Sequence, residues 1–214
     1  MKIVTFSFLF VTAFMFSQQK QLFSSDIKLN SIQFVTNNLD DITIENSKTE
    51  KLEIILENDN SFPIRIVTNK RNETIVFSFQ KEETSGLESK VFRKYITKRL
   101  DRARIVVKVP KGKEISVFGQ VVGVVSKSYV GDLSIYIDKG NVKLEEVKGN
   151  VSVNLFLGNI YAEINETNLT LKTVHGIIEI DEKNKETNLF ESSAANKFNL
   201  SVKSIHANIY LTKK

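Results

Sequence analysis

Hydrophobic and polar residues alternate with a fixed period of nine in the second half of the chain. From residue 131 to residue 184 the sequence divides into the units GDLSIYIDK, GNVKLEEVK, GNVSVNLFL, GNIYAEINE, TNLTLKTVH and GIIEIDEKN. The third and fifth positions of every unit are apolar, and the fourth and sixth are mostly polar. Alternation with a period of two is typical of a strand with one buried face. Each unit therefore predicts a short strand followed by a turn.

The first two positions of each unit predict the turn itself. Glycine is first in five of the six units, and Asp or Asn is second in five. Glycine adopts positive φ without steric cost, and an Asx side chain bonds its own backbone. Units this small cannot bury a face alone, so a constant period predicts stacked coils with two units in each.

We therefore expect an all-β protein, a β-solenoid or β-roll-like stack of short strands. Units one, three and five would form one sheet, and units two, four and six the other. A twisted antiparallel β-sandwich, with Gly-Asn at its hairpins, is the alternative fold. A calcium-binding nonapeptide repeat is a weaker alternative, because Asn stands here where calcium prefers charged oxygen ligands.

The remaining sequence extends the strand pattern into one domain over residues 18–214. Residues 18–83 predict N-terminal strands, and residues 105–214 contain the Gly-Asx ladder. Alternating segments at 198–202 and 208–211 predict the last strand pair, at the far end of the stack. The stretch between these parts, 84–104, lacks the strand period.

This stretch, TSGLESKVFRKYITKRLDRAR, is a basic insertion that fits a short helix or a long hairpin loop. It is either a solvated connection between strands or a contact site for an anionic partner. The candidate partner-binding residues are Arg93, Lys94, Lys98 and Arg99.

The N-terminus predicts export. Lys2 precedes an apolar run that ends at Phe16, followed by Ser17 and Gln18, so residues 1–17 are typical of a signal peptide cleaved after Ser17. The run is shorter than the roughly 20 residues of a membrane span, and no integral membrane segment is expected after signal removal. The chain has no cysteine and a net charge of +5, which is too mild to indicate nucleic acid.

The sequence predicts no catalytic residue, cofactor or metal site. His175 and His206 precede equivalent corner positions and are expected to be turn residues. Glu179 and Asp181 are expected to be solvated on an outer face. Tyr136 and Tyr161 face outward and could stack on sugar rings, but on opposite sheets. A stack of coils is expected to have convex sheets and no cleft.

Several segments resemble one family. The chain resembles the putative-adhesin beta-strand-repeat family of exported bacterial proteins in four segments. These are the IxI strand at Ile42 and Ile44, the segment VKVPKGKEISV at 107–117, the Gly-Asx ladder and the closing SIHANIYLTKK. The signal ending in FSQQ resembles those of the Bacteroidota. The basic insertion, Thr167 in place of the ladder glycine and Ala207 in place of the last glycine depart from the pattern.

The resemblance implies a non-catalytic exported envelope protein, an adhesin-like binding or structural module in the periplasm or at the cell surface. Its partner would be an anionic envelope polymer or a protein, and no oligomeric state is indicated. The alternative is a β-helical enzyme that acts on polysaccharide. That alternative needs a concave groove lined by Asp, Arg and aromatic residues, which the sequence does not show.

Overall fold

The computed structural model describes residues 19–58, 63–82, 103–185, 188–192 and 196–214. Within these residues every regular element is a strand, which confirms the all-β class. The first nine strands are β1 (Gln19–Asp26), β2 (Ser31–Val35), β3 (Asp41–Asn46), β4 (Lys51–Asn58), β5 (Ile64–Arg71), β6 (Thr74–Lys81), β7 (Ala103–Val109), β8 (Glu114–Val121) and β9 (Gly123–Lys127). The others are β10 (Leu133–Glu145), β11 (Val151–Ile164), β12 (Thr167–Lys172), β13 (Ile178–Ile180), β14 (Lys183–Lys185), β15 (Leu189–Ser192) and β16 (Phe198–Lys213).

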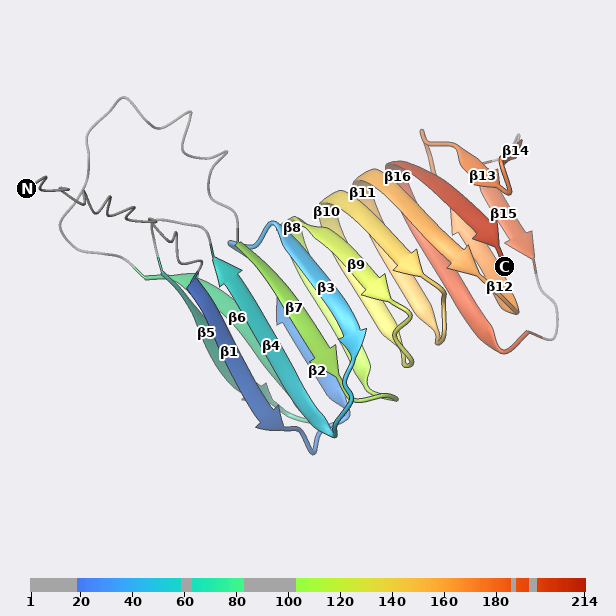
Figure 1. Ribbon diagram of the computed structural model, residues 1–214. Coiled ribbons are helices and arrows are strands. Elements are labelled where there is room, and N and C mark those ends of the chain that lie inside the picture. Colours follow the sequence, from blue (N-terminus) through green and yellow to red (C-terminus); the bar gives the residue numbers. More distant parts are fainter. Residues whose placement is uncertain (1–18, 59–62, 83–102, 186–187, 193–195) are drawn as a thin grey trace, which may run out of the picture.

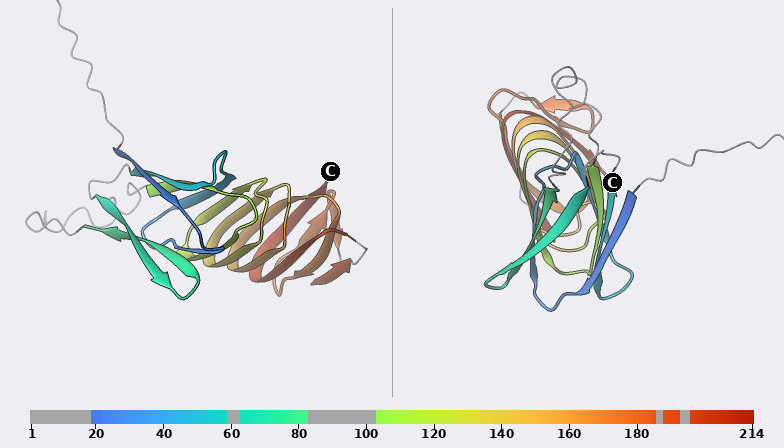
Figure 2. Two further views of the ribbon diagram at one scale, coloured as in Figure 1. Left: turned by 90° about the horizontal axis from the view of Figure 1, so that it is seen from below. Right: turned by 90° about the vertical axis from the view of Figure 1, so that its left-hand side faces the viewer.

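The strands form two facing layers joined at their corners (Figure 1). Layer A contains β5, β6, β2, β8, the first halves of β10, β11 and β16, then β12 and β15. Layer B contains β1, β4, β7, β3, β9, the second halves of the same three long strands, then β13 and β14. Figure 2 shows the chain winding around the space between the layers as nested arcs. The described part of the chain has no helix that could cross a membrane.

The ladder strands pair in parallel with an offset of two units. Leu133 of β10 is in register with Ile115 of β8 on one side and Val151 of β11 on the other. Val142, on the second half of β10, is in register with Val124 of β9. Each step is 18 residues, the length predicted for one coil of two nine-residue units.

The order of coils along the stack differs from their order in the chain. The long strand β16 pairs with β11 on one side and with β12 and β13 on the other. Unit five therefore stacks on β16, and not on unit three as the sequence analysis expected. The segments 198–202 and 208–211 lie inside the stack, where the sequence analysis expected its end. In the N-terminal half the order also differs. In layer A, β2 lies between β6 and β8, and in layer B, β3 lies between β7 and β9.

Antiparallel strands close both ends of the stack. At the N-terminal end β5 pairs with β6, and β4 pairs with both β1 and β7. At the other end β15 pairs with β12 and β14 with β13. A parallel stack would otherwise end in long open edges that invite pairing with another chain. At the C-terminal end the closing strands are short, and the edge strand β14 is the polar segment Lys-Asn-Lys.

The predicted alternation of buried and outward positions is confirmed. Val151 and Val153 are buried, whereas Ser152 and Asn154 stand on the outer face. The third and fifth positions of all six units are buried, namely Leu133, Ile135, Val142, Leu144, Val151, Val153, Ile160, Ala162, Leu169, Leu171, Ile178 and Ile180. They belong to one core cluster that spans both layers. Burying a Val, Leu or Ile side chain contributes about 1.5–3 kcal/mol to the free energy of unfolding. These twelve positions therefore provide a large part of the stability of the fold.

The two corners of a coil are built differently. Gly140 and Gly158 lie inside the continuous strands β10 and β11, with φ of 155° and 147°, and pair with each other. A Cβ on Gly158 would overlap the carbonyl oxygen of Gly140. Gly149 lies in the opposite corner, between strands, without the positive φ that the sequence predicts. It is restricted instead by contact, since a Cβ there would overlap the carbonyl oxygen of Gly131.

The Asx residue after each corner glycine holds the coils together. Asn159 donates to Oδ1 of Asn141 at 3.3 Å and accepts from Nδ2 of Asn208 at 3.2 Å. At the other corner Asn199 donates to Asn150 at 2.8 Å and accepts from Asn168 at 3.1 Å. An amide both donates and accepts, so it can continue such a row from coil to coil, which a carboxylate cannot do. This explains the preference for Asn at the second position.

We expect Asn159→Ala to lower the free energy of unfolding by about 1–2 kcal/mol, because it removes two side-chain hydrogen bonds inside a row. Asn141→Ala should cost about half as much, since Asn141 lies at the end of the row and has one of these bonds. Urea denaturation of the two variants measures the difference. Equal losses would show that the row adds nothing beyond local turn preference.

Candidate binding groove

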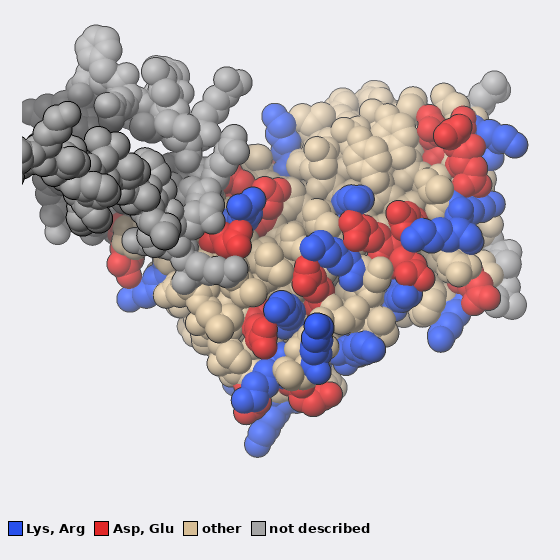
Figure 3. Space-filling view, viewed as in Figure 1, with Lys and Arg blue, Asp and Glu red and all other residues tan. Residues whose placement is uncertain are grey.

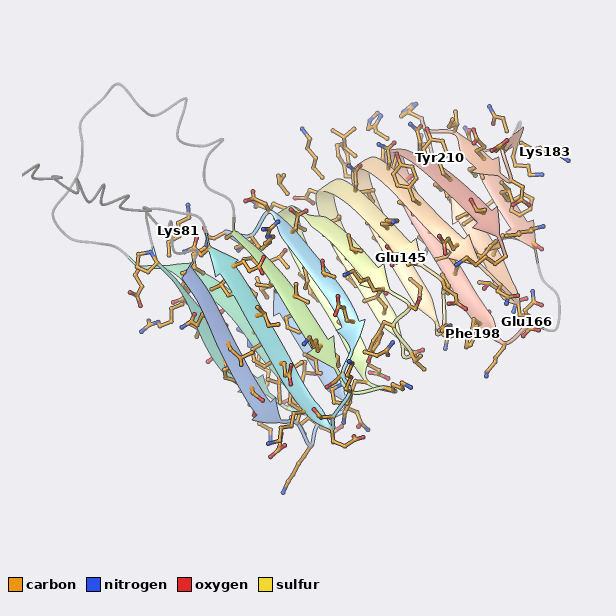
Figure 4. All side chains as sticks on the ribbon, viewed as in Figure 1. Lys81, Glu145, Glu166, Lys183, Phe198 and Tyr210 are labelled. Carbon is orange, nitrogen blue, oxygen red and sulfur yellow. The ribbon has the colours of Figure 1, made fainter. Side chains whose placement is uncertain are left out.

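The two outer faces differ in how their charges are arranged. Ion pairs between described residues all belong to layer B or its turns, including Arg104–Glu57 at 2.7 Å and Lys127–Glu45 at 2.8 Å. The hydrogen bond from Lys127 to Glu45 raises the pKa of this lysine. Figure 3 shows Lys and Glu interspersed across this face, and Figure 4 shows Glu145 among its side chains. Layer B is therefore a charge-balanced surface.

Layer A contains a groove with a volume of about 800 Å³. It crosses the strands and runs along the stack, from Val35 on β2 to Lys172 on β12. Its other lining residues are Asn37, Phe118, Gly119, Gln120, Tyr136, Ile137, Asp138, Asn154, Leu155, Phe156, Lys203, Ser204 and Ile205. The sequence analysis expected convex sheets without a cleft, and the groove corrects that expectation.

The strand register forms the groove by aligning outward side chains into rows. The first row consists of consecutive register partners on β8, β10, β11, β16 and β12. They are Phe118, Tyr136, Asn154, Lys203 and Lys172, in that order. Two positions further along the strands, Gln120, Asp138, Phe156 and Ile205 form a second set. Since neighbouring strands are about 4.8 Å apart, the first row is about 19 Å long. The groove lies along these two rows.

Two aromatic rings stack at one end of the first row. The rings of Phe118 and Tyr136 have centroids 4.9 Å apart and an interplanar angle of 9°. They remain 36% and 41% exposed. One face of Tyr136 covers Phe118, so its other face is turned toward Asn154 on the next strand.

The short side chain of Asn154 leaves a gap in the first row, here called the slot. This side chain is shorter than tyrosine and lysine, and it lies between Tyr136 and Lys203. Tyr136 and Lys203 are therefore two strand spacings apart, about 10 Å between backbones. This width accommodates one flat ring. Within the described residues no hydrogen bond engages the amide of Asn154, so the amide can serve a ligand.

Two lysines stand beyond the slot. Lys203 and Lys172 are direct register partners on β16 and β12, and both are exposed. Neither forms an ion pair with another described residue, in contrast to the paired lysines of layer B. Like charges placed directly opposite each other on neighbouring strands are unfavourable.

The other side of the groove is apolar and ends at the histidines. Phe156 is 51% exposed and Ile205 is 42% exposed. Phe156 packs edge-on against His206 with centroids 5.4 Å apart, and His206 stacks on His175 at 4.8 Å. The two histidines stack on each other at neighbouring corners, as their equivalent positions predict. The expectation that both are turn residues is wrong for His206, which lies inside the continuous strand β16.

The other residues singled out from the sequence have separate locations. Arg93, Lys94, Lys98 and Arg99 lie outside the described residues, so their contact with an anionic partner stays a prediction. Ala103 and Arg104, at the end of the predicted insertion, belong to strand β7. Tyr161 lies on layer B, opposite Tyr136 as expected, and stacks on Tyr210 with centroids 5.1 Å apart (Figure 4).

The groove chemistry suits binding better than acid–base catalysis. Among its described lining residues, Asp138 is the only carboxylate. Glycoside hydrolysis ordinarily needs a pair of carboxyl groups about 5–10 Å apart. Glu179 and Asp181 do not line the groove, and Asp181 accepts from the Lys213 amide at 2.8 Å. A row of aromatic, amide and ammonium groups can hold and orient an extended ligand.

The protein is therefore a coil-stacked β protein with a groove lined by polar and aromatic side chains. The sequence matches no protein-family model, and no curated protein matches it. The structure is similar to the crystal structure of a putative cell adhesion protein from Clostridium sporogenes, with a TM-score of 0.63, 11% identity, and coverage of 92% of this chain and 100% of that chain. A putative adhesin from Bacteroides fragilis matches with a TM-score of 0.36, 14% identity, and coverage of 91% of this chain and 98% of that one.

The Clostridium similarity shows a shared fold over nearly the whole chain. At 11% identity it carries no residue roles. It confirms the resemblance to proteins named putative adhesins. The sequence analysis inferred that resemblance from the repeat pattern and the closing segment.

Proposed function

We propose that this protein is a non-catalytic binding module of the bacterial envelope and that the groove on layer A is its binding site. The observation that carries the proposal is the row from Phe118 to Lys172, which presents exposed aromatic, amide and cationic groups along one line. A long groove that is open to solvent suits an extended partner better than a small molecule, whose sites enclose most of the ligand surface. The structurally similar protein from Clostridium sporogenes is named a putative cell adhesion protein, which supports the same interpretation.

Export to the periplasm or the cell surface is part of the proposal. It is supported by the signal-peptide pattern of residues 1–17. A cysteine-free exported domain must be stable without disulfides. The continuous core and the Asn rows provide that stability.

Retention of native envelope material on immobilised protein tests the proposal. We expect Tyr136→Ala combined with Phe156→Ala to reduce the retained material about tenfold or more, because exposed aromatic anchors carry much of the energy of a binding surface. Both side chains are exposed, so thermal melts should change little.

The matched control is Tyr161→Ala with Tyr210→Ala, which removes a similar aromatic pair from layer B. This variant should retain envelope material as the parent does. Equal retention by all three proteins would reject the groove as the binding site, and turnover of a polysaccharide lost on Asp138→Asn would support the enzyme alternative instead.

A further inference from the structure

We infer that the groove binds an acidic polysaccharide, with one sugar ring in the slot against Tyr136 and its carboxylate beside Lys203 and Lys172. This inference rests on the proposed function, in which the groove is the binding site. It adds the chemical class of the ligand and its orientation.

The slot is suited to a flat ring with a polar edge. A pyranose has an apolar face of C–H groups, which packs on an aromatic ring, and a rim of hydroxyl groups. The open face of Tyr136 supplies the aromatic surface, and the amide of Asn154 lies below it to donate and accept. Phe156 and Ile205 form the apolar side of the same groove.

The charge distribution selects an acid and orients it. Asp138 is on β10, the same strand as Tyr136, whereas Lys203 and Lys172 are two and three strands further along the stack. The groove therefore changes from negative to positive along its length. A carboxylate is repelled at the Asp138 end and attracted at the lysine end.

The pair Lys203 and Lys172 supports anion binding independently of the aromatic slot. An anion bound between two ammonium groups removes their mutual repulsion, and neither lysine forms an ion pair with a described carboxylate. If Lys203 stabilised the fold, its replacement would lower the melting temperature of the protein. Removing Lys203 should instead leave the melting temperature unchanged or slightly higher while it weakens binding.

The length of the groove points to a polymer instead of a single sugar. The row of five strands from Phe118 to Lys172 extends about 19 Å, which is longer than one ring. Neighbouring sugar units can continue over the Phe118 end and over the lysine end. The hydroxyls of Ser134, Ser152 and Ser201, on an adjoining row of layer A, offer further polar contacts.

Calorimetric titration with defined oligosaccharides tests the inference. The acidic probes are oligogalacturonate, oligomannuronate and oligoglucuronate, and the neutral probe is methyl-esterified oligogalacturonate. We expect at least one acidic probe to bind. If oligogalacturonate is that probe, the Kd of its ester should be about tenfold higher or more. Lys172→Gln with Lys203→Gln should raise the Kd for the acid about tenfold and leave that for the ester unchanged.

Two variants separate the ring contact from the charge contact. Tyr136→Ala should weaken the acid and the ester alike, whereas Tyr161→Ala on layer B should weaken neither. Lys51→Gln with Lys70→Gln removes the same charge from the N-terminal end of the stack and should leave the Kd unchanged. The melting temperature of Lys203→Gln should not fall.

The inference is wrong if no acidic probe binds, if acid and ester bind equally, or if the Lys51 and Lys70 variant weakens the acid as much as the groove variant. The proposed function survives these results when Tyr136→Ala with Phe156→Ala still loses envelope material. It fails separately when that variant retains the material fully.

Discussion

Val153→Asp is expected to leave the protein unfolded, or to lower its free energy of unfolding by more than about 4 kcal/mol. Val153 is fully buried on β11, between Ile135 of β10 and Val202 of β16, which are also fully buried. A carboxylate there has neither water nor a cation, and burying an unpaired charge costs several kcal/mol. A domain is typically stable by only about 5–15 kcal/mol.

Ser152→Asp is the matched control, since the neighbouring side chain points out of the same strand. Its effect should stay within about 0.5 kcal/mol, as for most surface positions. Thermal unfolding followed by circular dichroism compares the two variants. Similar melting temperatures would show that the assignment of inner and outer positions is wrong.

The second large effect is expected from Gly158→Val. Gly158 has φ of 147°, and a Cβ would overlap the carbonyl oxygen of Gly140 on the neighbouring coil. The unfavourable backbone conformation costs roughly 1–2 kcal/mol, and overpacking against backbone typically adds about 1–3 kcal/mol. We expect a total loss of about 2–5 kcal/mol in chemical denaturation.

Thr167→Val provides the comparison for a β-branched residue at a ladder corner. Thr167 already has a branched side chain there, and its hydroxyl donates to the Asn165 carbonyl at 2.8 Å. Loss of that bond should cost about 1 kcal/mol. A Gly158→Val variant no less stable than Thr167→Val would contradict the close approach of the coils at this corner.

The repeating coil could be predicted from the sequence because its pattern is local. Alternation fixes which residues are buried, and the period fixes the 18-residue step between Leu133 and Val151. The corner at Gly140 was harder to predict from the sequence, because the strand β10 bends there without ending. The coil order could not be predicted, since β11 offers the same alternation to β12 as to β16.

The site was predictable only in part for the same reason. Tyr136 was recognised as an outward aromatic residue, and the 18-residue step places Phe118 beside it. Lys203 and Lys172 join the row only because β16 lies between β11 and β12, at offsets of 49 and 31 residues. No local pattern contains these offsets, so the groove was missed.

Site-specific photo-crosslinking most directly tests the claim that the groove is the binding site. Gln120 lines the groove, and replacing it with p-benzoylphenylalanine places a photoreactive group there. The same replacement at Lys143, exposed on layer B, is the control. The account predicts envelope polysaccharide crosslinked from position 120 but not from 143, with the product lost when Tyr136→Ala is added. Equal crosslinking from both positions, or crosslinking at 120 unaffected by Tyr136→Ala, would contradict it.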